Sequence, residues 1–180
     1  MDPAGWIDTS APYVRPGREG AADAWSEEAA RRGHVGTNEL REVGEITAPD
    51  DIARDLGIEG ERHVVVRRRL VLLDGVPIEL ADSYYPVSIA RGTPLAQPGK
   101  IRGGAVRLLA DLGHRARRVE ETVSARPATA TERDLLRLGP TDWVLVLRRV
   151  SHDEAGTPYE STVMTMVAEG RELRYEHEEG

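Results

Sequence analysis

Two kinds of side chain in this sequence have the chemistry to hold a small charged molecule. Arg67 and Arg69 lie in a run rich in β-branched residues, and a guanidinium can clamp a carboxylate through two parallel hydrogen bonds. Glu160 directly precedes the alternating segment STVMTMV, where it shares one face with Met164 and Met166. A carboxylate that points into the interior from such a face needs a cation or a polar ligand. The methionines predict an apolar surface against the same ligand.

A glycine pair could supply backbone donors. Gly103 and Gly104 open the segment GGAVRLLADLG, which predicts a helix of about ten residues that ends at Gly113. The free N–H groups of its first turn, including that of Ala105, form an anion site, because the helix dipole is positive at this end. We therefore expect Arg69 and the glycine pair to hold the polar end of a ligand, and Glu160 to take a hydroxyl or an amine.

Each of these residues also has a purely structural interpretation. Arg67 and its neighbours could alternate between the faces of a strand and pair with Glu79 and Asp82. Ser83, Tyr84 and Tyr85 fit the wall of a pocket or the surface of a sheet equally well. Glu79 is more simply a surface residue that pairs across strands. The sequence leaves these alternatives open.

The residues that disulfides, metal sites and common catalytic motifs require are absent from the sequence or wrongly spaced. The chain has no cysteine, which excludes disulfides, thiolate catalysis and cysteine-based zinc sites. His63, His114 and His152 share no metal-ligand spacing, so no metal is expected. There is no phosphate-binding glycine loop, nucleophile elbow or HExxH segment. Glu120 and Glu121 are neighbours on a predicted strand and point to opposite faces. We expect no cofactor and assign no catalytic residue.

Composition narrows the class of protein. The 180 residues carry a net charge of -7, and the arginines are interleaved with acids, which argues against a basic face for DNA. No apolar run approaches the roughly 20 residues that a membrane span needs. The N-terminus has no apolar segment of the signal-peptide type. The default expectation is a cytoplasmic protein with no membrane partner.

The chain divides into a tail and one domain. Residues 1–36 are rich in proline and glycine and predict a linker, with a brief helix over Asp23–Arg32 that Trp25 anchors. Residues 37–180 predict the folded domain. It begins with a strand over Leu40–Ile46 and a short helix capped by Thr47 or Ala48, and it ends with a short strand around Leu173–Tyr175.

An internal repeat organises this domain. Two units each run from a helix to a β-rich strand with paired arginines, a polar turn, and Gly-x-Pro-x-Glu at the start of the return strand. The matched residues are Gly75, Pro77 and Glu79 in the first unit and Gly156, Pro158 and Glu160 in the second. The repeat predicts an α+β fold, in which two pseudo-equivalent β-hairpins share one antiparallel sheet and helices cover it.

This arrangement resembles the UTRA domain, which has the chorismate-lyase-like fold. Four segments carry the resemblance across residues 37–178: RHVVVRRRLVLLDGVPIELADSYYP, IRGGAVRLLADLGH, EETVSARPATATERDLLRLG and DEAGTPYESTVMTM. The resemblance implies a pocket between the sheet and the middle helix, with contacts at positions matching Arg69, Gly103–Gly104 and Glu160. Members that bind sugar phosphates carry Ser where this chain has Gly104 and Tyr where it has Met166. We therefore do not expect a phosphosugar.

The resemblance implies a role in transcription regulation. UTRA domains are the effector-binding part of GntR/HutC-family regulators, and the winged helix-turn-helix that precedes them is not recognisable here. We expect a domain that binds a small anionic or amphipathic metabolite, forms a homodimer or a heterodimer with a related regulator, and does not itself bind DNA. The alternative is a biosynthetic enzyme built on the same fold, which rests on analogy alone.

Overall fold

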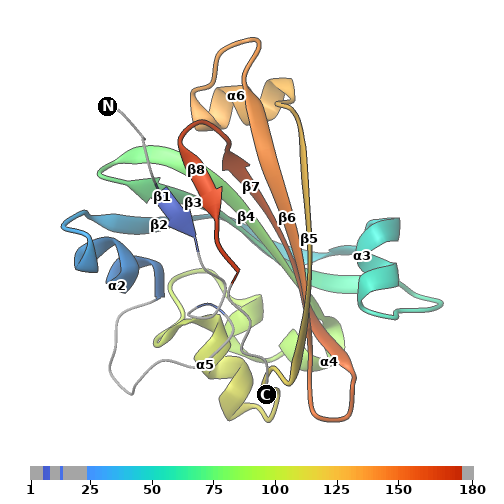
Figure 1. Ribbon diagram of the computed structural model, residues 1–180. Helices are drawn as coiled ribbons and strands as arrows, with labels where there is room; N and C mark the ends of the chain where they lie inside the picture. Colours follow the sequence, from blue (N-terminus) through green and yellow to red (C-terminus); the bar gives the residue numbers. More distant parts are fainter. Residues whose placement is uncertain (1–5, 9–12, 14–23, 176–180) are drawn as a thin grey trace.

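One antiparallel sheet forms the body of the molecule (Figure 1). The computed structural model describes residues 6–8, 13 and 24–175. The sheet has six strands in the order β2-β3-β4-β7-β6-β5. These strands are β2 (Gly36–Thr47), β3 (His63–Leu73), β4 (Val76–Pro86), β5 (Arg118–Pro127), β6 (Trp143–His152) and β7 (Pro158–Val167). The α+β class with an antiparallel sheet, predicted from the sequence, is confirmed.

The strand order reflects the internal repeat. The first half is β2, helix α3 (Asp50–Asp55) and the hairpin β3–β4, and the second half is β5, helix α6 (Ala130–Leu136) and the hairpin β6–β7. The halves meet in the middle of the sheet, where β4 pairs with β7. The first half ends at the edge strand β2 and the second half ends at the opposite edge strand, β5. The two predicted hairpins are therefore pseudo-equivalent parts of one sheet.

Local signals in the sequence explain the ends of these elements. Asp74 and Gly75 both have positive φ, as a two-residue hairpin turn requires. Thr129 and Glu132 form the predicted capping box of α6. The Arg126 guanidinium beside Glu132 lowers the pKa of that carboxyl to about 2. Two bounds differ from expectation: Pro49 is the N-cap of α3, and the last strand, β8, covers Arg171–Leu173.

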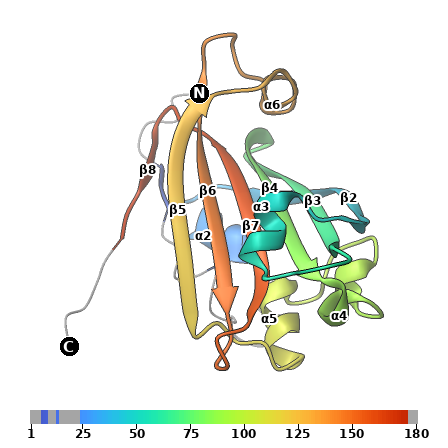
Figure 2. The ribbon, with the colours of Figure 1, turned by 90° about the vertical axis from the view of Figure 1, so that its right-hand side faces the viewer.

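Different helices pack on the two faces of the sheet. Ile52 of α3 packs on Val64 and Val66, and α6 packs near Leu70 and Val144; we call this side the back face. The opposite side, the front face, is covered by helix α2 (Ala24–Arg31), by α4 (Val87–Ala90), by the 3-10 turn η1 (Pro94–Ala96) and by α5 (Gly104–Asp111). Figure 2 shows α6 and β8 on opposite sides of the sheet.

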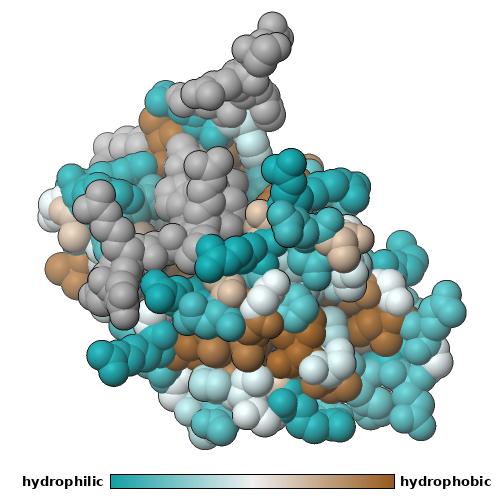
Figure 3. All heavy atoms as spheres, turned by 90° about the horizontal axis from the view of Figure 1, so that it is seen from below, coloured by the Kyte–Doolittle hydropathy of each residue, from teal (hydrophilic) through white to brown (hydrophobic). Residues whose placement is uncertain are grey.

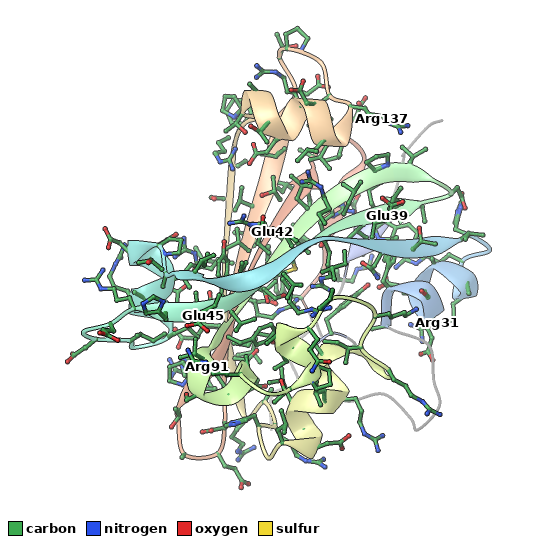
Figure 4. The ribbon with its side chains drawn as sticks, turned by 180° about the vertical axis from the view of Figure 1, so that it is seen from behind. Arg31, Glu39, Glu42, Glu45, Arg91 and Arg137 are labelled. Carbon is green, nitrogen blue, oxygen red and sulfur yellow. The ribbon has the colours of Figure 1, made fainter. Side chains whose placement is uncertain are left out.

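The connection between the two halves builds one end of the front face. Residues 87–117 form α4, η1 and α5, and their apolar side chains pack on Val65, Tyr85 and Tyr159 of the sheet. Seen from below, this end of the molecule gathers apolar side chains among polar ones (Figure 3). Arg91, just after α4, bonds Glu45 of β2 at 2.7 Å, and Figure 4 shows the two side chains side by side.

The described residues before Gly36 are part of the fold, which differs from the predicted linker over residues 1–36. The strand β1 (Trp6–Asp8) pairs in parallel with β8. The predicted helix is confirmed as α2, and its anchor Trp25 is 6% exposed and donates to the carbonyl of Leu72. Arg32 lies over the Trp6 ring, 4.1 Å from its centroid. The rest of the predicted linker lies outside the described residues.

The contact between α2 and β2 gives a test of the packing. A Cβ added at Gly36 would lie 2.7 Å from Nε1 of Trp25 and 2.8 Å from Cβ of Ala29, both in the core. We predict that Gly36→Ala lowers the free energy of unfolding by about 1–3 kcal/mol, because overpacking forces the tryptophan away from its hydrogen bond. Urea denaturation followed by tryptophan fluorescence measures the change.

Gly44→Ala is the matched control on the same strand. A Cβ at Gly44 has nothing within 4 Å, so this variant should be neutral or slightly more stable than the wild type. Equal effects of the two substitutions would contradict the packing of α2 on β2.

Candidate functional site

A row of polar side chains crosses the front face of the sheet. Consecutive residues of the row lie directly opposite each other across the strands, and the row consists of Arg67, Ser83, Thr162, Arg149 and Glu121. On one side of this row lie Arg69, Ala81 and Met164, and on the other lie Tyr85 and Glu160. The front face therefore has a polar band beside the cover formed by α4, η1 and α5.

Ser83 is the centre of this band. It accepts hydrogen bonds from Nη2 of Arg69 at 3.2 Å and from Oγ1 of Thr162 at 3.0 Å. Its own hydroxyl bonds Tyr85, and the Tyr85 hydroxyl bonds the carboxylate of Glu160. A continuous chain of hydrogen bonds thus links Arg69 on β3 to Glu160 on β7.

Arg149 and Glu121 form a closed ion pair in the same row. Nε of Arg149 lies 2.6 Å from Oε1 of Glu121, and the two side chains are only 9% and 10% exposed. Burial and the Glu121 charge raise the pKa of Tyr175, which follows β8 and bonds Glu121. This pair fixes β5 to β6 and connects the segment after β8 to the polar row.

Glu160 lies deep in the front face. Many protein atoms surround its carboxyl, yet part of the residue still reaches solvent. Burial raises the pKa of Glu160 above its ordinary value, while the Tyr85 hydrogen bond and the charges of Arg149 and Arg69 act in the opposite direction. No described cation lies within ion-pair distance of Glu160.

Arg69 has no carboxylate partner within the described ranges. Its hydrogen bond goes to the neutral hydroxyl of Ser83, and the residue is partly accessible. Leu40 is the residue opposite Arg69 on β2, so the neighbouring strand offers no acid there. Because a guanidinium keeps its charge at all physiological pH values, the site presents a cation whose charge no acid balances directly.

Arg67 is fully engaged with the chain that leads to α5. Its Nη1 donates to the carbonyls of Pro94, Leu95 and Gln97, and its Nη2 to that of Gly99, at 2.7–3.2 Å. Burial lowers the pKa of Arg67. This residue, predicted to contact ligand directly, instead holds the 94–99 segment against the sheet.

The helix opening lies over the same end of the sheet. Gly103 and Gly104 both have positive φ, of 77° and 81°, so residues with side chains would be strained at both positions. On either side of them, Ile101 and Ala105 pack into the cluster that contains Tyr85. The first turn of α5 is thereby held above the part of the front face that carries Tyr85.

Three predicted site residues do not lie beside Glu160. Tyr84 points to the back face, where it packs with Ile52 of α3, because side chains alternate along a strand and Tyr85 takes the front. Met164 shares the front face but packs toward Trp25 of α2. Met166 is 2% exposed and lies six residues beyond Glu160, about 20 Å along the strand. A small ligand at Glu160 does not reach it.

Ser83 and Tyr85 were predicted as pocket wall or sheet surface, and three residues of this site were not predicted from the sequence: Thr162, Arg149 and Glu121. One signal was present, since the paired arginines recur in both units of the repeat and place Arg149 at the position of Arg69. The polar row itself depends on the register between strands, and no short sequence pattern predicts that register.

The described residues offer neither a metal site nor a membrane-spanning helix. Among them, no group of three or more His, Asp and Glu side chains is placed to hold a metal ion. None of their helices has the length and apolar character of a membrane span.

Comparison with known proteins gives this site its context. The UTRA domain profile matches residues 31–170. The chain belongs to the UTRA domain family. It is 31% identical over 138 residues to an uncharacterized HTH-type transcriptional regulator of Streptomyces coelicolor, and the match covers 75% of this chain and 51% of the relative. A similar regulator of Rhizobium meliloti is 29% identical over 146 residues, covering 77% of this chain and 59% of the relative.

Solved structures share the fold. The effector domain of PhnF from Mycobacterium smegmatis has a TM-score of 0.73 at 21% identity, covering 91% of this chain and 99% of that one. By its membership of the UTRA family, this chain is a ligand-binding regulatory domain. It spans roughly half the length of its curated relatives, at 51% and 59%.

The raised pKa of Glu160 gives a test by pH. A carboxyl that binds its proton more tightly in the folded state stabilises the fold at low pH, and this contribution is lost as pH rises above 4.5 through the raised value. We predict that Glu160→Gln gains stability over the wild type between pH 4.5 and pH 8. Each tenfold difference in proton affinity between the folded and unfolded states contributes about 1.4 kcal/mol to this gain. Urea denaturation of both proteins across this range measures the difference.

Glu154→Gln is its control, because Glu154 is exposed in the turn between β6 and β7. A difference between Glu160→Gln and wild type that stays constant with pH would show that Glu160 is not desolvated.

The carbonyl contacts of Arg67 give a second test. An ammonium cannot span four carbonyls from residues 94 to 99, so Arg67→Lys should lower stability by about 1–3 kcal/mol. It should also speed amide hydrogen exchange over residues 94–104. Arg62→Lys is the control, because Arg62 is exposed and pairs only at the surface with Asp50. If amide hydrogen exchange over residues 94–104 is unchanged in Arg67→Lys, Arg67 does not fix this segment to the sheet.

Proposed function

We propose that this UTRA domain is the effector-binding domain of a GntR/HutC-type transcription regulator and binds a small anionic metabolite on its front face. The observation that carries the proposal is Arg69, a partly accessible guanidinium whose hydrogen bond goes only to the hydroxyl of Ser83. An anion that replaces water there gains a charge-assisted, bidentate contact.

The helix opening supports the same ligand. A Cβ at Gly104 would meet nothing within 4 Å, and a Cβ at Gly103 would contact only the side chain of Arg107. The N–H of Gly104 donates to the carbonyl of Ile101, and the N–H groups of Ala105 and Val106 that follow it can approach an anion closely. The rigid hold of Arg67 on the 94–99 segment keeps this opening in place above the sheet.

The first experiment is a thermal-shift screen of the purified chain against carboxylates, phosphate esters and sulfonates. An anion at about 100 times its Kd should add roughly 2.7 kcal/mol of stability, or about 5–10 °C in Tm. Mass spectrometry of each hit after incubation separates binding from turnover. A compound recovered unchanged supports an effector-binding domain, and a compound consumed supports the alternative of an enzyme on this fold.

Variants locate the site of any hit. Arg69→Gln should weaken binding of the anion by at least about tenfold, since a hydrogen bond to a charged group contributes about 1.5–3 kcal/mol. Arg62→Gln, on the surface between α3 and β3, should leave the affinity unchanged. Isothermal titration calorimetry measures both. A hit that binds Arg69→Gln as tightly as wild type lies outside the proposed site.

Two further expectations belong to the same proposal. We expect the domain to form a homodimer, or a heterodimer with a related regulator, and not to bind DNA by itself. The acidic balance of the chain, with a net charge of -7, supports the second expectation.

A further inference from the structure

The front face carries two opposite charges that lack partners, while its other charges are matched. Arg149 pairs with Glu121, Arg171 pairs with Glu79 at 3.0 Å, and Arg67 is surrounded by carbonyls. Among the described residues, only Arg69 and Glu160 on the strands of this face have charged groups without an ion-pair partner or a set of backbone acceptors.

The internal repeat relates these residues in pairs. Arg69 and Arg149 occupy equivalent positions in the two hairpins. Arg69 lies opposite Ala81, two residues after Glu79, and Arg149 lies opposite Thr162, two residues after Glu160. Glu79 and Glu160 are equivalent in the same way. One arginine and one glutamate of the two pairs have fixed partners, Glu121 for Arg149 and Arg171 for Glu79. The other arginine and glutamate lie on the same face of the sheet without them.

Arg69 and Glu160 also do not neutralise each other. The strand β4 lies between β3 and β7, and Arg69 is level with Met164, which is four residues from Glu160. Their backbones are therefore about 10 Å apart across the strands and about 13 Å apart along them. Arg69 affects the pKa of Glu160 through its charge alone, without a hydrogen bond. The surface between them consists of the hydroxyl groups of Ser83, Thr162 and Tyr85, which are neutral.

We infer that the ligand of this site is a zwitterion that places an ammonium group at Glu160 and a carboxylate at Arg69. The inference rests on the proposed function and specifies its ligand. An ammonium group has three donors for the open positions of the Glu160 carboxylate, and a carboxylate matches the planar fork of the guanidinium.

Other ligand classes fit the charges less well. A simple anion would satisfy Arg69 but would bring negative charge toward Glu160, which then has to remain protonated. A neutral polyol would leave both charges without a partner in a partly desolvated site. The titratable and charged groups that face Glu160 are Arg69 on β3, Tyr85 on β4, Arg149 on β6 and Tyr159 on its own strand.

A cation at Glu160 also changes its protonation. Because burial favours the protonated carboxyl in the free domain, an ammonium group should drive the proton off as it binds. Binding of a zwitterion near the pKa of Glu160 should therefore release a fraction of one proton. A desamino acid should release none.

The experiment uses matched probes with the full chain. The twenty standard α-amino acids and the ω-amino carboxylates from 3-aminopropanoate to 6-aminohexanoate are each titrated beside the corresponding desamino acid. We expect at least one amino carboxylate to bind about tenfold or more tighter than its desamino partner, as one charged hydrogen bond allows. Calorimetry in two buffers with different ionisation enthalpies counts the released protons.

Variants separate this inference from the proposed function. Glu160→Gln should abolish both the amine preference and the proton release while it retains binding of the desamino acid. Arg69→Gln should weaken both probes by the same factor, and Glu154→Gln should change neither.

Three outcomes overturn the inference. Desamino acids that bind as tightly as amino acids, in an Arg69-dependent way, refute the zwitterion and leave the anion site standing. A preference for amines that survives Glu160→Gln also refutes it. If no amino carboxylate binds while another anion does, the ligand is not of this class; absence of any Arg69-dependent anion binding removes the proposed function as well.

Discussion

The cost of burying guanidinium groups on one face of a sheet governs this structure. A desolvated arginine requires hydrogen-bond acceptors, and the arginines of the front face obtain them from different parts of the chain. Arg67 donates to backbone carbonyls of the 94–99 segment, whereas Arg149 pairs with Glu121 and Arg171 pairs with Glu79. These contacts hold the connecting segment and the terminal strand β8 against one face of the sheet and join the edge strand β5 to β6. Arg69 is the arginine for which the described chain supplies only a hydroxyl.

The pseudo-symmetric sheet explains how such a site arises. Two similar hairpins place an arginine and a glutamate at matching positions, but the two halves have different neighbours. In the second half, β5 brings Glu121 opposite Arg149, whereas in the first half β2 brings Leu40 opposite Arg69. A single difference on an edge strand thus turns a structural ion pair into an available cation. The connection between the halves then covers the end of the sheet that carries Val65 and Tyr85 with α5.

The site is connected to both ends of the described chain. Arg171 of β8 bonds Glu79, Tyr175 contacts Glu121, and β8 pairs with β1 at the start of the described residues. The Trp6–Trp25 contact, with ring centroids 5.1 Å apart, joins β1 to α2. In a regulatory domain, a ligand that reorganises the polar row would act on contacts that lead directly to these terminal elements. This arrangement gives a physical route from the site to neighbouring segments.

The sequence alone determined the α+β class, the two hairpins, the capping box of α6, the turn at Asp74–Gly75 and the fact that Glu160 and the methionines share a face. These follow from local rules of periodicity, turn chemistry and capping, which need only a few neighbouring residues. It also directed attention to Arg69, Glu160 and the glycine pair. Tertiary structure alone decided that Arg67 holds a segment, that Tyr84 faces away and that Met166 is distant. Strand register and the path of the connection settle those points, and both depend on residues far apart in the chain.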